Sequence, residues 1–203
     1  MDLARTIRRP VFLIVFFLLA AAVLINIFSL DIIIQQFFYT QKGWEYGSGR
    51  WAYLLYNYGT YPGLALSGLA LVVLASGFVL KKAASYRKEA LIVILTVMLG
   101  PGLIINVISK EYTGRPRPRE ITEFGGQWKF KKVFEFGKPG MGHSFPAGHP
   151  SAGFLFYALY AALRRRHGKT AAGFFWFSIL YGSAIGAARM AQGGHFFSDV
   201  IWS

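Results

Sequence analysis

Three short segments of this chain carry the residue types that phosphoryl chemistry uses. They are residues 110–119, 144–149 and 189–199, and between them they hold one lysine, four arginines, two histidines and an aspartate. An arginine side chain offers two donors in a plane to phosphoryl oxygens, and a lysine offers a point charge. Histidine can serve as a nucleophile or as a proton donor near neutral pH. The residue types therefore predict a site for a phosphoryl group that is assembled from separate parts of the chain.

The third segment contains the pair that is best suited to nucleophilic catalysis. His195 and Asp199 are four residues apart, which places them on one face of a helical turn. Asp199 could accept a hydrogen bond from one ring nitrogen of His195 and leave the other nitrogen nucleophilic. His149 then remains for proton transfer to the leaving oxygen. Gly148, beside a helix start, could offer backbone N–H groups to an anion.

Two further arginines in the first segment have two possible roles. Arg115 and Arg119 either bind a second anionic group of the substrate or pair with neighbouring glutamates, and these are Glu111, Glu120 and Glu123. The sequence contains no cluster of carboxylates suited to magnesium and no cysteine, so we expect neither a metal nor a cofactor.

The composition predicts that these segments belong to a membrane protein. Apolar residues make up 54% of the chain and charged residues 15%, against about 25% charged residues in soluble domains. The net charge is +13, but a nucleic-acid-binding module normally carries its basic patch on a soluble fold. We therefore expect an all-α, polytopic transmembrane helix bundle in one domain, and no nucleic-acid partner. Five apolar stretches are long enough to be spans, namely residues 11–30, 61–80, 90–109, 149–163 and 171–188.

The segments between the spans predict an orientation. Residues 31–60 are rich in tryptophan and tyrosine, which favours an interfacial position. The loops at residues 1–10, 81–89 and 164–170 hold 11 basic residues in 26, whereas the opposite set of segments spreads 11 over 80. The denser set should be cytoplasmic, so the loop 110–148 should face outward. Each chemical segment is separated from the next by one span or by a hairpin of two, so all three should reach the same membrane face.

The three segments together resemble a known family. The pattern Lys-x6-Arg-Pro, then Pro-Ser-Gly-His, then Ser-Arg-x5-His-x3-Asp resembles the type 2 phosphatidic acid phosphatase superfamily of integral membrane lipid phosphatases, over about residues 60 to 199. Two positions depart from this pattern. Ala147 stands where the family usually has a serine whose hydroxyl meets the phosphate, and Ala188 stands where it has the serine before arginine.

The resemblance implies a two-step, metal-independent transfer. His195 attacks phosphorus while Asp199 orients it, and His149 protonates the departing alcohol and later activates water. The residues implied to hold the phosphoryl oxygens are Lys110, Arg117 and Arg189.

The expected substrate is a membrane lipid phosphate at the outer, periplasmic face of the inner membrane. The outward basic loop favours a large anionic headgroup such as lipid A 1-phosphate, and residues 115–126 also resemble bacterial lipid A phosphatases. Phosphatidylglycerol phosphate, phosphatidic acid and undecaprenyl diphosphate are the alternatives within this class. The resemblance also extends to haloperoxidases, which are soluble, and a transporter or lipid-binding scaffold is the non-enzymatic alternative.

The end of the chain carries one more expectation. Family members continue through a sixth span that begins at the aspartate of the third motif, whereas only residues 199–203 follow here. Five residues cannot cross a bilayer. We therefore expect a fragment of a longer protein, with Ile201 and Trp202 opening the missing helix.

Overall fold

The protein is helical throughout the part of the chain that the structure describes. The computed structural model describes residues 3–138 and 140–203, with side chains for 12–105, 112–138 and 140–203. Every element named in this part is a helix, and strand-like pairing is limited to two isolated bridges, Thr40 with Gly43 and Ile121 with Trp128. The predicted all-α fold is confirmed.

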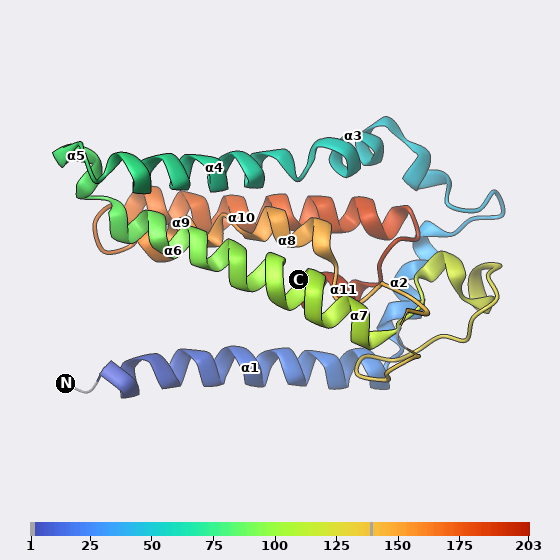
Figure 1. The fold of residues 1–203 in the computed structure, drawn as a ribbon. Helices are drawn as coiled ribbons and strands as arrows, with labels where there is room; N and C mark the ends of the chain where they lie inside the picture. Colours follow the sequence, from blue (N-terminus) through green and yellow to red (C-terminus); the bar gives the residue numbers. More distant parts are fainter. Residues whose placement is uncertain (1–2, 139) are drawn as a thin grey trace.

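Long helices lie side by side and form an elongated bundle (Figure 1). The long elements are α1 (Leu3–Ile27), α4 (Tyr61–Ser76), α6 (Arg87–Val97) and α10 (Gly168–Ala191). The shorter helices are α2 (Leu30–Phe38), α3 (Arg50–Tyr58), α5 (Lys81–Ala84), α7 (Lys110–Thr113), α8 (Gly148–Phe154), α9 (Tyr157–Leu163) and α11 (Phe197–Ile201). Single 3-10 turns occur at Glu45–Ser48, Pro118–Glu120 and Thr122–Phe124. Helix α10 packs against α8, α9 and α3 and forms the centre of the bundle.

Within the described residues, three helices are long and apolar enough to cross a membrane, and a bent pair would make a fourth. The three are Arg50–Ser76, Arg87–Ile105 and Gly168–Ala191. The second apolar helix therefore begins at Arg50, inside the segment predicted to be interfacial, because α3 continues into α4. The bent pair is Phe12–Ile27 with Leu30–Phe38, at 71° to one another. Ser29 lies at this bend with a positive φ of 51°.

The predicted span 149–163 is not one continuous helix. It is divided into α8 and α9, each of seven residues. At the break, Ala158 N–H donates to the Leu155 carbonyl, three residues back rather than four. The Ser178 hydroxyl of α10 donates to the Phe154 carbonyl at 2.8 Å. A carbonyl that the break withdraws from the helix is thus satisfied by a neighbouring helix, as an apolar environment requires.

The predicted span 90–109 is not a regular α-helix along its whole length. Residues Met98–Ser109 continue α6 as a π-helical segment with Pro101 inside it. Proline lacks the N–H of a regular helical hydrogen bond, and π-turns are one of the ways in which helices accommodate such a position.

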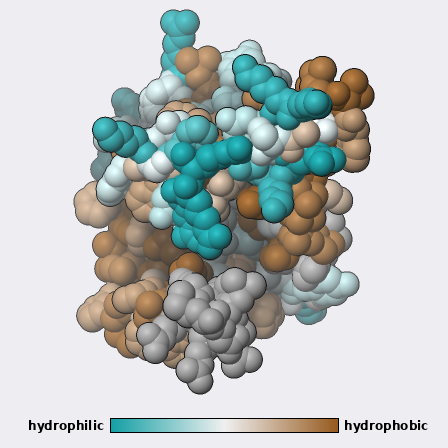
Figure 2. All heavy atoms as spheres, turned by 90° about the vertical axis from the view of Figure 1, so that its left-hand side faces the viewer, coloured by the Kyte–Doolittle hydropathy of each residue, from teal (hydrophilic) through white to brown (hydrophobic). Residues whose placement is uncertain are grey.

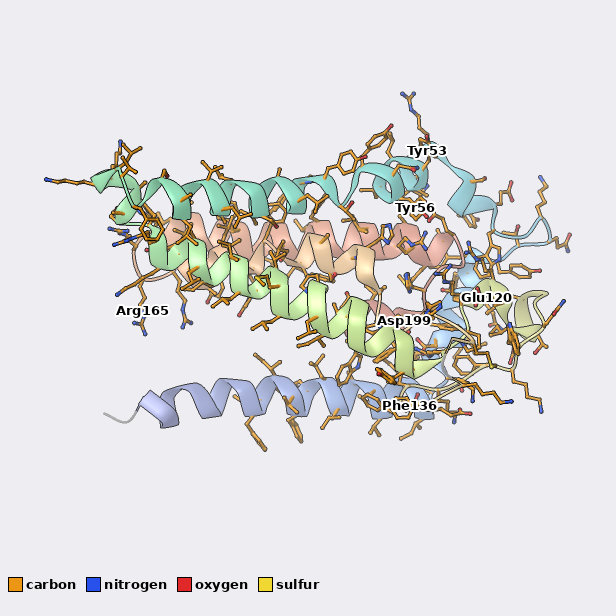
Figure 3. All side chains as sticks on the ribbon, in the orientation of Figure 1. Tyr53, Tyr56, Glu120, Phe136, Arg165 and Asp199 are labelled. Carbon is orange, nitrogen blue, oxygen red and sulfur yellow. The ribbon has the colours of Figure 1, made fainter. Side chains whose placement is uncertain are left out.

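Two ends of the bundle differ in chemistry. The N-terminus, α5 and the loop between α9 and α10 lie at one end, whereas α2, α7, α11 and the start of α8 lie at the other (Figure 1). Figure 2 looks onto the first end and shows hydrophilic side chains gathered across it, with hydrophobic side chains on the flanks. Arg165 lies at this end, far from Tyr56 and Asp199 (Figure 3). Residues of the three chemical segments lie together around one cavity, and their position at one membrane face stays a prediction.

A close helix contact fixes the second segment against the third. A Cβ atom on Gly153 of α8 would lie 2.6 Å from the Cα of Gly182 of α10, so the two backbones touch and no side chain fits between them. Small residues permit such close approaches between membrane helices. This contact fixes the position of His149, at the start of α8, relative to Arg189, near the end of α10.

Candidate active site

A polar cavity of about 290 Å³ lies at the end of the bundle where the three segments meet. Its lining comes from α3, α8, α10 and the loops around them. The lining residues are Tyr56, Arg117, Arg119, His143, His149, Arg189, Gln192 and His195. Five of these eight were predicted as site residues from the sequence. The cavity combines three guanidinium groups with three imidazoles, and this composition suits an anion.

His195 lies between α10 and α11 and is only 3% exposed. Its Nδ1 atom lies 2.7 Å from the backbone carbonyl oxygen of Ser144. Because a carbonyl can only accept, Nδ1 carries the proton, and the lone pair of the neutral ring is at Nε2. Burial is the largest influence on the pKa of His195 and lowers it; Arg189 acts in the same direction, while Asp199 opposes it. The ring is therefore neutral, with the nucleophilic nitrogen that phosphoryl transfer needs.

Asp199 does not bond directly to His195 as the spacing predicted. Its Oδ2 atom lies 3.8 Å from Nδ1 of His195, which is too far for a hydrogen bond. Instead, Oδ2 accepts from the hydroxyl of Ser144 at 2.5 Å and from the backbone N–H of Phe196 at 2.7 Å. Ser144 therefore links the two residues, because its carbonyl accepts from the imidazole while its hydroxyl donates to the carboxylate. Burial alone would raise the pKa of Asp199, but the charge of Arg115 and the hydrogen bond from Ser144 hold it below its usual range.

Arg115, expected either at a substrate headgroup or paired with a glutamate, does neither. Its side chain is 2% exposed and forms ion pairs with Asp31 at 2.7 Å and with Asp199 at 2.5 Å. Its Nε donates to the carbonyl of Lys131 at 3.0 Å. The ring of Phe196 lies 4.6 Å from the guanidinium carbon. The preceding residue, Gly114, turns the chain with φ +52° and so directs this loop inward.

Arg117 and Arg189 line the cavity, as predicted for phosphate-binding residues. Each has a buried Nε donor that makes no hydrogen bond within the described part of the chain. Buried donors without partners are costly, and a phosphoryl oxygen is a suitable acceptor for them. Arg189 also donates to the side-chain oxygen of Gln192 at 2.5 Å and lies 4.5 Å from the ring centre of Tyr56. Arg119 is exposed and also lines the cavity, so it remains suited to a second anionic group.

The remaining predicted residues lie at the same end of the bundle. His149 stacks on the ring of Tyr56 with centroids 5.0 Å apart and planes at 21°. Gly148 is the first residue of α8 and directly precedes His149. Lys110 begins α7, but its side chain lies outside the described residues.

Four functional side chains escaped the sequence analysis. Tyr56 and Gln192 line the cavity, while Asp31 and Ser144 bind the residues behind it. A signal existed for Asp31 alone, because an acid directly after an apolar span requires a partner. His143, which the sequence analysis did not place among the site residues, also lines the cavity.

Comparison with known proteins gives one family. The model of the PAP2 superfamily matches residues 89–203, which is more than half of the chain. No solved structure gives a significant match.

Three curated proteins are similar to this chain. The chain is 36% identical over 133 residues to a lipid A 4'-phosphatase of Francisella tularensis subsp. novicida, which is 65% of this chain and 59% of that protein. It is 37% identical over 108 residues to a lipid A 4'-phosphatase of Rhizobium leguminosarum, with 52% and 45% covered. A protein of the same name from Rhizobium etli is 36% identical over 106 residues, with 51% and 40% covered. The chain thus spans less than two thirds of the length of these relatives.

Proposed function

Because this chain belongs to the PAP2 superfamily, we propose that it hydrolyses a phosphate monoester of a membrane lipid through a phosphohistidine. The observation that carries this proposal is the geometry of His195. Its Nδ1 proton is engaged by the Ser144 carbonyl at 2.7 Å, so the lone pair at Nε2 is available in a cavity lined by arginines.

The reaction has two steps. In the first, Nε2 of His195 attacks phosphorus, the bond to the lipid oxygen breaks, and His149 donates a proton to that oxygen. In the second, His149 removes a proton from water and the water oxygen attacks the phosphohistidine. The bond between phosphorus and nitrogen breaks, its electrons return to His195, and orthophosphate leaves. Each step needs one proton transfer, and the arginines stabilise charge on the equatorial oxygens in both.

The proposed mechanism uses no metal. The buried carboxylates Asp31 and Asp199 are both ion-paired with Arg115. Among the described residues, no group of three or more histidines, cysteines, aspartates or glutamates has the arrangement of a metal site. Neutralisation of phosphoryl charge is therefore assigned to Arg117 and Arg189.

The proposed substrate is a lipid A-type phosphate. The exposed Arg119 supports a large anionic headgroup, because it extends the positive lining of the cavity beyond Arg117 and Arg189. The sequence favours the 1-phosphate, whereas the names of the curated relatives favour the 4'-phosphate. We give the 4'-phosphate precedence, since similarity over half of the chain is the stronger argument, and keep the 1-phosphate, phosphatidylglycerol phosphate, phosphatidic acid and undecaprenyl diphosphate as competing substrates.

The proposed location is the inner membrane, with the cavity at the periplasmic side. The support is the density of basic residues in the segments 81–89 and 164–170, which lie at the opposite end of the bundle and favour the cytoplasm for that end.

Release of orthophosphate by the purified protein from each of these lipids tests the proposal. His195→Ala should abolish release, and His149→Ala should slow it and let an acid-labile phosphoprotein accumulate. His167→Ala is the matched control, because His167 stacks on Tyr86 at the end of the bundle away from the cavity. Phosphate release by His195→Ala at the wild-type rate would show that the nucleophile is assigned wrongly.

A further inference from the structure

Asp31 is a buried carboxylate that the proposed mechanism does not use. It lies in the first turn of α2 and is 1% exposed. The family model begins at residue 89, so Asp31 is outside the matched region. A buried carboxylate is costly unless it is paired and hydrogen-bonded, so Asp31 requires partners inside the protein.

The partners of Asp31 all belong to the active site. Its Oδ2 atom accepts from Arg115 at 2.7 Å and from the hydroxyl of Ser198 at 2.6 Å. Its Oδ1 atom accepts from the backbone N–H of Ser198 at 2.8 Å. Ser198 directly precedes Asp199, and Arg115 donates to Asp199 through its other terminal nitrogen. One guanidinium is thus shared between the carboxylate of α2 and the carboxylate of α11.

We propose that Asp31 is a positioning residue for His195 and Asp199, and that the pair of helices α1 and α2 is therefore part of the catalytic unit. The proposal rests on the proposed function. Asp31 acts at a distance from the phosphoryl group, through Arg115 and Ser198.

Charge and geometry explain why Asp199 alone would not hold Arg115 in this orientation. Arg115 is held between two acceptors, so its second terminal nitrogen cannot turn toward Asp199. Without Asp31, both terminal nitrogens would be free to bind Asp199 as a bidentate pair, which is the preferred geometry. That rotation would draw Asp199 away from the hydroxyl of Ser144.

The displacement would reach the nucleophile through Ser144. Its hydroxyl donates to Asp199 and its carbonyl accepts from Nδ1 of His195, so movement of the carboxylate changes the orientation of the imidazole. Within the described part of the chain, Asp31 bonds to Arg115 and Ser198 and not to the cavity arginines, so substrate binding should change little. The expected signature is a loss of kcat with KM nearly preserved.

The test compares Asp31→Asn with a matched control in the same pair of helices. Asparagine keeps the size of the side chain but carries no charge, and its single oxygen cannot replace both carboxylate oxygens that accept from Arg115 and from the backbone N–H of Ser198. The control is Asn26→Leu in α1, which removes the hydrogen bonds between Asn26 and the backbone of Val133 at 3.0 and 3.2 Å. Both variants loosen the N-terminal helices from the rest of the protein, but only the first changes the partners of Arg115.

We expect Asp31→Asn to lower kcat by about tenfold or more with KM changed by less than about twofold, and Asn26→Leu to keep kcat even where its melting temperature falls. In an Asp199→Asn background, Asp31→Asn should cost less than about twofold, because residues that act through one another are not additive. Losses that multiply in the double variant, or a loss in Asp31→Asn that Asn26→Leu reproduces, would overturn the proposal.

A readout without turnover separates this proposal from the proposed function. The chain has four histidines, so the Nδ1 proton of His195 can be assigned in protein labelled with ¹⁵N-histidine by its loss in His195→Ala. Asp31→Asn should shift this resonance and Asn26→Leu should not. If the wild-type protein hydrolyses none of the lipids, the proposed function fails, while an unshifted resonance in Asp31→Asn rejects the positioning role by itself.

Discussion

Replacing Arg115 by methionine should unfold the active site rather than weaken one substrate contact. The guanidinium forms two ion pairs, at 2.7 and 2.5 Å, with side chains that are 2% exposed or less. At an effective dielectric constant of about 20, each pair represents roughly 6 kcal/mol of attraction, and most of this offsets the cost of removing the charges from water. Removal of one partner from a buried pair typically costs about 3–5 kcal/mol, because the remaining charge stays buried. Here two carboxylates, Asp31 and Asp199, would remain and repel each other.

We therefore expect Arg115→Met to lower the free energy of unfolding by about 3–5 kcal/mol and to abolish hydrolysis of every substrate. Arg119→Met is the matched control, because Arg119 is exposed and also lines the cavity. It should leave stability unchanged and raise KM for a bis-phosphorylated lipid more than for phosphatidic acid. Thermal or denaturant unfolding in detergent micelles, combined with KM for both lipids, measures these effects. An Arg115→Met protein with the wild-type melting temperature and a selective rise in KM would refute the buried role and restore the headgroup role.

Three other predictions concern the nucleophile, the phosphate cradle and the metal. Burial lowers the pKa of His195 below its ordinary 6.5, so kcat/KM should not fall as the pH drops through 6.5. Folding stability should decline below that pH, because the unfolded chain then takes up a proton that the folded ring does not; an acid limb at or above 6.5 that belongs to this residue would contradict the assignment. A methyl group added by Gly194→Ala would lie 2.5 Å from a terminal nitrogen of Arg189, so we expect weaker inhibition by vanadate, measured as a higher inhibition constant, and equal inhibition would show that the guanidinium simply moves aside. Exhaustive chelation should leave phosphate release unchanged, and restoration of lost activity by magnesium would argue against the metal-independent mechanism.

Several features of the fold could be predicted from the sequence. Apolar runs of about twenty residues require helices, because a backbone in hydrocarbon must satisfy its own hydrogen bonds. The number of membrane passes between segments then fixes which segments share an end, whatever the packing. By this reasoning the sequence brought Arg117, His149 and Arg189 to the cavity, which the structure confirms. The break between α8 and α9 could not be predicted, because it depends on the hydroxyl that Ser178 supplies from another helix.

The residue types of the site and the end of the bundle at which they gather could be predicted from the sequence, because both follow from local spacing and from counting passes. The hydrogen-bond and ion-pair partners of these residues depend on the tertiary fold. In the folded protein, the Nδ1–H group of His195 donates to the Ser144 carbonyl, and Arg115 lies between Asp31 and Asp199. Such partners are separated by tens of residues, and the exclusion of water from their common position makes the pairing of buried charges obligatory. A short motif shows which charged residues the chain contains, whereas their burial in the folded protein requires particular ones to form ion pairs.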